Sequence, residues 1–193
     1  MARFCRDFLN KKAAKVMASL GWTNWKNSFV TALINIAAPA LPCNNFFGAK
    51  RAIYRTAGLL VGRGAKLGSC ISIYSQGIIM IGENVWLGRA ANFNVPNGAK
   101  VMIGESCDIA PYVKFMCGSH LIGPSSRRAG SCTARDIVIG NGCWIGTSVT
   151  ILGGAIVGHG TVIAAGSVVL PRAYPPNVLL AGVPAKPIRG LEP

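Results

Sequence analysis

Residues 139–169 read IGNGCW, IGTSVT, ILGGAI, VGHGTV, IAAGSV and a final V, so that an aliphatic residue returns at every sixth position. The fifth position of each unit is always small: Cys143, Val149, Ala155, Thr161 and Ser167. A strand alternates its faces with a period of two residues and a helix has a period of about 3.6, so a period of six fits neither alone. The period predicts a solenoid in which each unit forms one short strand and one tight corner, with the aliphatic residues stacked inside.

The same ladder extends toward the N-terminus. It starts as VGRGAK, LGSCIS and IYSQGI, slips by two residues before IGENVW, and resumes after VPNGAKVM as IGESCD, IAPYVK and FMCGSH. In this frame the ladder positions are Val61, Leu67, Ile73, Ile81, Leu87, Phe93, Ile103, Ile109, Phe115 and Leu121. We therefore expect the solenoid to occupy residues 61–170.

The pattern is interrupted after Leu121. Leu121 and Ile139 are eighteen residues apart, which equals three units, but the intervening GPSSRRAGSCTAR has turn-forming residues and arginines in place of an aliphatic pattern. We expect a loop extruded from one corner at about residues 121–136. Loops that leave a rigid scaffold often carry functional residues. The roles of Arg127 and Arg128 in this loop stay open.

The composition fits one compact domain with a short preceding element. The chain has 193 residues, of which 51% are hydrophobic, and its 24 glycines suit the many corners of a solenoid. Charged residues make up only 13% of the chain, so we expect copies of the chain to cover much of its outer surface. Residues 1–60 and 171–193 are available to cap the two ends.

The formal net charge is +14, from 20 Lys and Arg against six acids. This charge fits either a generally basic protein or an anionic partner, such as a phosphorylated cofactor, an acidic polymer or a membrane surface. The aromatic residues do not interleave with Lys and Arg, and the sequence contains no DNA- or RNA-binding motif. We therefore expect no nucleic-acid partner.

Residues 1–60 form a separate, basic and partly apolar element. Its first part, residues 1–26, has apolar residues at helical spacing, and FGAKRAIYRTAG predicts a short basic amphipathic helix that leads into the first coil. The apolar run Phe29–Leu41 is shorter than the roughly 20 residues of a membrane span and contains Pro39. We expect a helical cap on the solenoid; peripheral contact with an anionic membrane face and a true transmembrane anchor are the alternatives. No convincing cleavage site follows, so we do not expect a signal peptide.

Cysteine and histidine counts limit the chemistry. The seven cysteines have no CxxC pair and no paired spacing, which indicates a reducing compartment and a cytoplasmic location, with the inner membrane face as a peripheral alternative. Cys107 and Cys143 occupy the small fifth position and are expected to be inert core residues. Only two histidines are present, so a zinc site of three histidines cannot be built within one chain, and we expect no metal.

His120 is the predicted catalytic residue. It ends the unit FMCGSH immediately before the interruption, and histidine supplies a proton acceptor with a pKa near neutrality without a metal. His159 occupies the third position of VGHGTV, which faces outward in a regular coil, and we expect it to be solvated. Cys117, three residues before His120, is an alternative candidate as a thiol nucleophile.

Several motifs together resemble the left-handed parallel β-helix acetyltransferases of the hexapeptide-repeat type. They are the ladder itself, ANFNV before a turn, GSH before a loop, CWIGTSVTILGGAIVGHGTVIAAGSVV, and the C-terminal PPNVLLAGVPAKPIRG. The nearest group is similar to the maltose/galactoside O-acetyltransferases and the acetyltransferases of exopolysaccharide sugars (colanic acid type). The resemblance covers roughly residues 60–190 and implies an all-β fold whose coil is left-handed, opposite to ordinary parallel crossovers.

The resemblance also implies a homotrimer with active sites between neighbouring β-helices, in which acetyl-CoA donates its acetyl group directly to a sugar hydroxyl. It assigns His120 as general base and residues 171–193 as a CoA-binding segment. The remaining positions that match the family are Thr147, Ala165, Lys186 and Arg189 for the cofactor, and Asn92 and Trp144 for the substrate.

Two departures leave the acceptor open. The turn VPNGAK lacks the acid that some sugar-acetylating relatives carry, and LPRAYPPN lacks their Thr-Lys pair. The acceptor is a small molecule or a polysaccharide unit. A xenobiotic or serine acetyltransferase of the same fold and a non-catalytic β-helix scaffold remain the alternatives.

Overall fold

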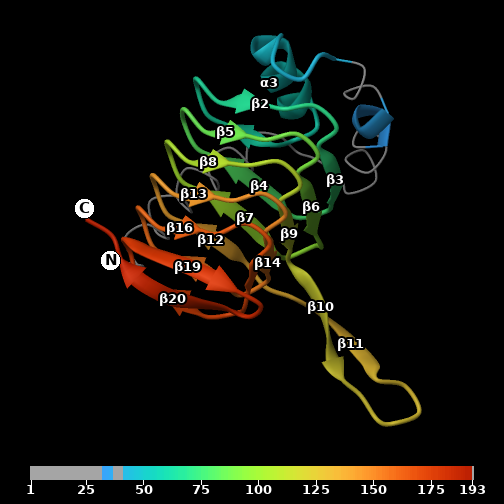
Figure 1. The fold of residues 1–193 in the computed structure, drawn as a ribbon. Helices are drawn as coiled ribbons and strands as arrows, with labels where there is room; N and C mark the ends of the chain where they lie inside the picture. Colours follow the sequence, from blue (N-terminus) through green and yellow to red (C-terminus); the bar gives the residue numbers. More distant parts are fainter. Residues whose placement is uncertain (1–31, 37–40, 193) are drawn as a thin grey trace.

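The computed structural model describes residues 32–36 and 41–192, and most of them form a three-sided parallel β-helix (Figure 1). Sheet 1 contains β1 (Leu60–Val61), β4 (Ile78–Ile81), β7 (Lys100–Ile103), β12 (Ile137–Ile139), β15 (Ile156–Val157) and β18 (Ala173–Tyr174). Sheet 2 contains β2 (Lys66–Leu67), β5 (Trp86–Leu87), β8 (Asp108–Ile109), β13 (Trp144–Ile145), β16 (Val162–Ile163) and β19 (Val178–Gly182). Sheet 3 contains β3 (Ser72–Ser75), β6 (Asn92–Val95), β9 (Lys114–Met116), β14 (Thr150–Leu152) and β17 (Val168–Val169).

Each coil passes through sheets 1, 2 and 3 in turn and then returns to sheet 1 one step further along. We name the three edges corner 1–2, corner 2–3 and corner 3–1 after the sheets that they join. At the C-terminal end, β20 (Ala185–Gly190) folds back antiparallel on β19 at the edge of sheet 2. The stacked parallel β-helix predicted from the six-residue period is confirmed; its left-handed sense stays an implication of the resemblance.

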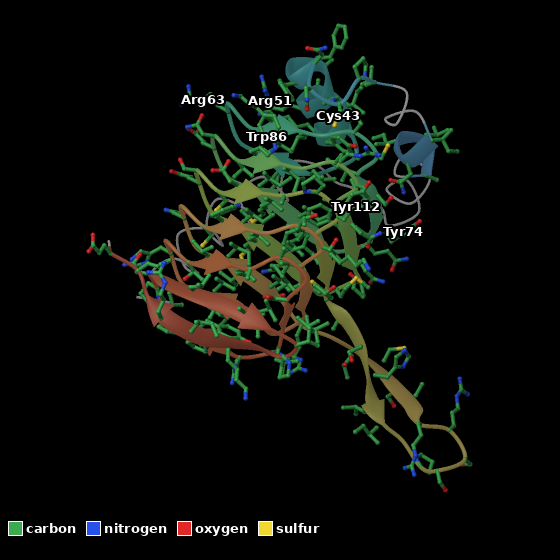
Figure 2. The ribbon with its side chains drawn as sticks, in the orientation of Figure 1. Cys43, Arg51, Arg63, Tyr74, Trp86 and Tyr112 are labelled. Atoms are coloured by element: carbon green, nitrogen blue, oxygen red, sulfur yellow. The ribbon has the colours of Figure 1, made fainter. Side chains whose placement is uncertain are left out.

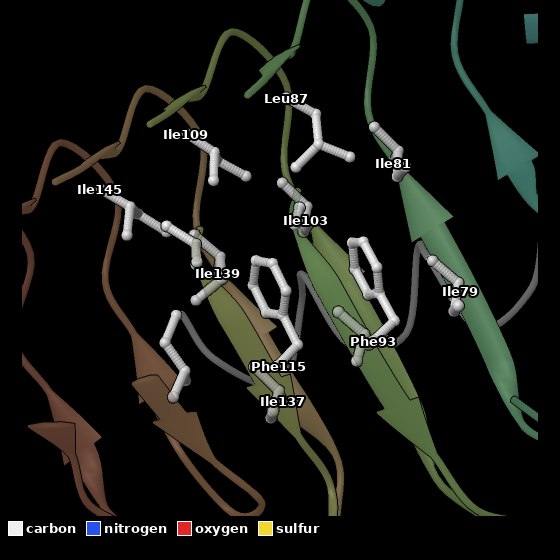
Figure 3. Packing of buried hydrophobic residues seen from close by; sticks show 14 of the residues in the cluster. Ile79, Ile81, Leu87, Phe93, Ile103, Ile109, Phe115, Ile137, Ile139 and Ile145 are labelled. Atoms are coloured by element: carbon white, nitrogen blue, oxygen red, sulfur yellow. The ribbon is translucent and has the colours of Figure 1, made fainter. Parts of the chain in front are cut away.

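The ladder residues fill the interior. Figure 3 shows Leu87, Ile109 and Ile145 following one another along sheet 2, and all three are at most 1% exposed. On sheet 3, Phe93 and Phe115 stack with ring centroids 4.7 Å apart and planes 9° from parallel. The small fifth-position residues, from Cys143 to Ser167, are buried as well. Burial of each large aliphatic side chain contributes about 2 kcal/mol, so the repeat itself forms the core.

Departures from the six-residue period all fall at corner 3–1. Ladder residues are six apart across corners 1–2 and 2–3 in every coil. Across corner 3–1 the spacing is eight from Ile73 to Ile81, ten from Phe93 to Ile103, and twenty-four from Phe115 to Ile139. The extra residues of the solenoid therefore gather on one edge of the molecule.

The largest insertion is a β-hairpin rather than an irregular loop. It consists of β10 (Gly118–Ile122) and β11 (Ala129–Ala134), which pair antiparallel and project from the body (Figure 1). The expected loop at about 121–136 thus begins three residues earlier, and the assignment of Leu121 to the ladder is wrong, because Leu121 is 59% exposed. The chain leaves the coil after Cys117 and returns at Arg135, whose N–H donates to the Cys117 carbonyl at 3.1 Å. Leu121 has the ladder spacing by coincidence.

The solenoid also runs further toward the C-terminus than residue 170. Tyr174 and Leu180 are 4% and 0% exposed, and the strands that contain them pair in register with β15 and β16. These residues form a sixth coil. The C-terminal segment therefore begins as part of the β-helix, and only β20 leaves it.

Helix α3 (Phe47–Thr56) covers the N-terminal end of the solenoid. Its Lys50 is 1% exposed, and the ammonium group donates to the carbonyls of Pro42 at 2.6 Å and Cys43 at 2.8 Å. Burial lowers the pKa of Lys50. Arg51 donates to the Ala65 carbonyl at 2.9 Å, so the basic side chains of α3 satisfy carbonyl groups of the preceding loop and of the first coil.

Residues 32–36 are helical and pin the first strand of sheet 3. The Asn35 side chain accepts from the Ile73 N–H at 3.0 Å and donates to the Ile73 carbonyl at 2.8 Å. Asn35 thereby hydrogen-bonds to the backbone of β3, which is the edge strand of sheet 3. The helix expected in residues 1–26 lies outside the described residues. Among the helices that are described, none is long and apolar enough to cross a membrane.

Glycines at corner 1–2 allow the coils to stack closely. A Cβ atom added to Gly140 would lie 2.5 Å from the backbone nitrogen of His159 in the next coil. Gly62, Gly82 and Gly158 meet the following coil equally closely. We predict that Gly140→Ala lowers the free energy of unfolding by about 1–3 kcal/mol, because the backbones must move apart.

Denaturant unfolding of Gly140→Ala and Gly190→Ala provides the measurement. Gly190 lies on β20, has nothing within 4 Å of an added Cβ, and serves as the matched control. Equal stability of the two variants would contradict the close stacking of corner 1–2.

Candidate functional site

An open hollow of about 720 Å³ lies at the base of the hairpin, along corner 3–1. Its wall is formed by the corner 3–1 turns of the first two coils and by both strands of the hairpin, which occupies the same corner in the third coil. The residues that line it are Gln76, Asn94, Pro96, Asn97, Gly98, Gly118, Ser119, His120, Cys132, Thr133 and Ala134. None of these described lining residues is Lys, Arg, Asp or Glu. The longer turns of corner 3–1 therefore build a polar, largely uncharged wall around a histidine.

The hairpin fixes the orientation of the His120 ring. His120 pairs with Cys132 across the two strands, and its Nδ1 lies 2.9 Å from the carbonyl oxygen of Gly130. A carbonyl can only accept, so this contact places the proton on Nδ1. Nε2 is then left with a free lone pair, as a general base requires. The hairpin thus holds the His120 ring in one orientation at the wall of the hollow.

Cys132 is a second reactive side chain beside His120, and sequence reasoning missed it. Its Sγ lies 3.8 Å from His120 Nδ1, and the side chain is exposed. Only the antiparallel register of β10 and β11 brings these two residues together. Neither GSHLI nor AGSCTA has the alternating pattern that would predict this pairing.

Cys117 does not share this surface. It is 1% exposed, and burial together with the nearby charge of Asp136 raises the pKa of its thiol to about 12. A buried thiol with so high a pKa is a poor nucleophile, so the geometry argues against the alternative that Cys117 attacks a substrate. Cys107 and Cys143 are buried in the core, as expected, and donate to the carbonyls of Gly140 and Gly158.

The predicted donor contacts lie on a different edge. Thr147 and Ala165 are both exposed at corner 2–3 in successive coils, where the N–H of Gly166 donates to the Thr147 carbonyl at 2.8 Å. The Thr147 hydroxyl donates to the Pro111 carbonyl at 2.9 Å. Asn92 begins β6 at this same corner and does not line the hollow. Its neighbour Asn94, at the opposite end of the strand, does line it.

The other predicted residues lie on or beside sheet 2. Trp144 is 59% exposed on its outer face, in register with Asp108 and Val162. Trp86, two strands from Trp144 on the same sheet, lies near the N-terminal end of the solenoid (Figure 2) and is 37% exposed. Its ring packs against Phe47 of α3. Lys186 and Arg189 are exposed on β20, at the C-terminal end of the same sheet. His159 is exposed at corner 1–2, away from both groups.

Sheet 3 separates the two groups within one chain. Its strands start at corner 2–3, near Thr147 and Ala165, and end at corner 3–1, where the hairpin carries His120. The strands of sheet 3, which are two to four residues long, lie between these two corners. The described part of a single chain therefore does not bring the predicted base and the predicted donor contacts together.

Comparison with known proteins identifies the repeat. The family model for the bacterial transferase hexapeptide (six repeats) matches residues 136–171. Over 115 residues the chain is 40% identical to a galactoside O-acetyltransferase of Escherichia coli, a match that covers 58% of this chain and 56% of that protein. It is 28% identical over 137 residues to a putative colanic acid biosynthesis acetyltransferase of Escherichia coli, covering 71% and 72%. The chain thus spans little more than half the length of the first of these relatives.

A solved structure agrees with the sequence relatives. The hexapeptide-repeat acetyltransferase of Vibrio cholerae, complexed with acetyl coenzyme A, superposes with a TM-score of 0.76 and 25% identity, covering 87% of this chain and 88% of that one. The resemblance to hexapeptide-repeat acetyltransferases that the sequence motifs indicate is confirmed by these matches.

The surroundings of the two thiols predict different reactivity. We expect iodoacetamide to alkylate Cys132 in the native protein at least roughly tenfold faster than Cys117, because Cys132 is exposed and the pKa of Cys117 is raised to about 12. Mass spectrometry of peptides after timed labelling gives both rates. Labelling in denaturant, where the two thiols should react alike, is the control. Native labelling of Cys117 as fast as Cys132 would show that the hairpin does not leave the coil as described.

Proposed function

We propose that this hexapeptide-repeat chain is an acetyl-CoA-dependent O-acetyltransferase that acetylates a hydroxyl of a sugar or a polysaccharide precursor. The observation that carries the proposal is the position of His120, whose Nδ1 is held by the Gly130 carbonyl at the wall of an open polar hollow. The acetyltransferase names of the relatives and of the structural neighbour support the reaction class.

His120 acts as general base in this proposal. Its Nε2 accepts the proton of the acceptor hydroxyl while the hydroxyl oxygen attacks the acetyl carbonyl carbon. The donor supplies an activated thioester whose thiol is the leaving group. Because the Nδ1–H donates to the Gly130 carbonyl, the ring stays oriented and the imidazolium that forms remains hydrogen-bonded. No acyl-enzyme is needed, since one base and a direct attack account for the transfer.

The donor would lie along corner 2–3 and the outer face of sheet 2. Backbone groups of Thr147 and Ala165 are accessible there, as contacts to a pantetheine arm require. Lys186 and Arg189 supply positive charge at the C-terminal end of sheet 2, where the phosphates of CoA would be neutralised. These residues fit the donor in exposure and in charge.

Two copies of the chain are needed to complete such a site. His120 and the donor contacts lie at opposite ends of sheet 3, so corner 3–1 of one copy must face corner 2–3 of another. A cyclic homotrimer satisfies this requirement with three equivalent sites.

The wall of the hollow favours a neutral, hydroxyl-rich acceptor. Gln76, Asn94 and Thr133 offer amide and hydroxyl groups that hydrogen-bond with sugar hydroxyls. An amino acid acceptor such as serine needs charged partners for its carboxylate and ammonium groups, and the described lining residues provide no Lys, Arg, Asp or Glu. The acceptor is therefore assigned to the sugar class in preference to serine. The six cysteines among the described residues are free, which supports a reducing, cytoplasmic setting for the reaction.

His120→Ala should lower kcat/KM by roughly 10²–10⁴-fold, because proton removal from the acceptor loses its base. Thiol release from acetyl-CoA in the presence of saccharide acceptors measures this loss. His159→Ala is the matched control, since His159 is exposed at corner 1–2, and it should retain full activity. An undiminished rate for His120→Ala would contradict this mechanism, whereas the absence of thiol release by the parent chain would favour the non-catalytic scaffold.

A further inference from the structure

Tyr112 is a large aromatic residue at a position where the other coils carry small ones. It lies in the corner 2–3 turn of the third coil (β7, β8 and β9), and its φ of 63° is in the left-handed region. The equivalent turn residues of the other coils also have a positive φ, and all of them are small: Cys70, Ala90, Ser148 and Gly166. A bulky side chain is unfavourable in this conformation. Burial offsets little of this, because Tyr112 is 47% exposed (Figure 2). The fold therefore gives no reason for an aromatic ring at this corner.

Arg89 holds the Tyr112 ring in place. The guanidinium carbon of Arg89 lies over the ring, 5.7 Å from its centroid. The N–H of Tyr112 donates to the Arg89 carbonyl at 3.0 Å, so the two residues are also joined through their backbones. A cation placed over an aromatic face restrains the ring. Corner 2–3 thus presents an oriented aromatic ring that is still half-exposed.

The ring continues the line of the proposed donor contacts. Backbone hydrogen bonds hold the turns of corner 2–3 above one another, and the N–H of Ser148 donates to the Pro111 carbonyl at 3.1 Å. From the C-terminal end, this corner presents Ala165, Thr147 and Tyr112 in successive coils, which are about 4.8 Å apart. A donor that passes Ala165 and Thr147 therefore ends one coil before Tyr112, and the ring stands on the side of the acceptor.

The hollow around His120 lies at the matching height on the other edge. Its lining turns belong to the first and second coils, and the hairpin that carries His120 leaves the third coil. A threefold axis parallel to the solenoid keeps equal coils of all copies at equal height. When corner 2–3 of a neighbouring copy faces the hollow, its Tyr112 lies opposite the base of the hairpin.

We propose that Tyr112 of the neighbouring copy binds the acceptor by stacking on one face of a pyranose sugar in the hollow. This inference rests on the proposed function, whose acceptor class it narrows to cyclic sugars. The C–H groups of a pyranose form an apolar face that packs on an aromatic ring. The hydroxyl groups at the edge of the same sugar remain free to bond with Gln76 and Asn94. Arg89 is a positioning residue for the ring.

Steady-state kinetics with methyl β-galactoside as the acceptor test the stacking. Tyr112→Ala should raise the KM for this acceptor about tenfold, while kcat and the KM for acetyl-CoA stay close to those of the parent chain. Tyr112→Phe keeps the ring and should match the parent chain. Sorbitol, an open-chain polyol without a ring face, should have the same KM with all three chains. An unchanged KM for the galactoside in Tyr112→Ala would overturn the proposal.

Stability and oligomeric mass separate stacking from a structural role. Ala90 has the same conformation one coil earlier, with a φ of 55°, so alanine is compatible with this turn. The denaturant midpoint of Tyr112→Ala should be no lower than that of the parent chain, and its mass by light scattering should be the same. A lower mass together with the raised KM would assign the ring to contact between copies and would contradict the stacking.

A mixed assembly tests whether the ring comes from a neighbour. Chains with His120→Ala and chains with Tyr112→Ala are unfolded together and reassembled in equal amounts, and transfer is measured well below the KM of the acceptor. About a quarter of the parent activity should return, because one site in four joins an intact His120 to an intact Tyr112. Activity no higher than the average of the two separate assemblies would place both residues in the same copy and overturn the inference.

The stacking and the proposed reaction fail separately. Saturation-transfer NMR with methyl β-galactoside detects binding without any reaction. If the parent chain binds the galactoside, Tyr112→Ala does not, and no thiol is released from acetyl-CoA, then the stacking stands and the reaction does not. If thiol release is normal and galactoside binding is equal in both chains, then the reaction stands and the stacking does not.

Discussion

The register between stacked coils is the constraint on which the rest of the structure depends. Parallel ladders join each strand to its counterparts in the adjacent coils, so every inward residue must stand over the one before it. An extra residue within a strand would turn the following side chains to the opposite face. Additional residues are therefore accommodated at a corner, and this chain places all of them at corner 3–1. The hollow and His120 lie on that edge as a consequence.

The regular part of the molecule could be predicted from the sequence because its signal is local and repeated. The six-residue spacing within each coil between Val61 and Phe115, and the unbroken one from Ile139 to Val169, specifies both the strands and their burial. The sixth coil was harder to foresee, because a five-residue step from Val169 to Tyr174 breaks the frame and the inward residue is aromatic.

The site could be predicted only in part. His120 stands beside the interruption of the ladder, and the interruption is visible in the sequence. Its contacts with Gly130 and Cys132 depend on the pairing of GSHLI with AGSCTA, and neither stretch has the alternating pattern that predicts strands. The misassigned Leu121 shows the same limit, since correct spacing does not reveal whether a residue faces the core or solvent. The burial of Lys50, a residue of α3, could not be predicted either, because its carbonyl partners come from an irregular loop.

The proposed reaction combines two edges that a single chain keeps apart. Assemblies that contain two different variant chains test this requirement directly. A chain with His120→Ala and a chain with Ala165→Tyr, which fills the exposed donor corner, are each expected to be inactive alone. Unfolded together and reassembled in equal amounts, they should recover about a quarter of the parent activity, because one site in four then joins an intact His120 to an intact corner 2–3 of its neighbour. No recovery above the separate chains would contradict the account, since both edges would then have to come from the same copy.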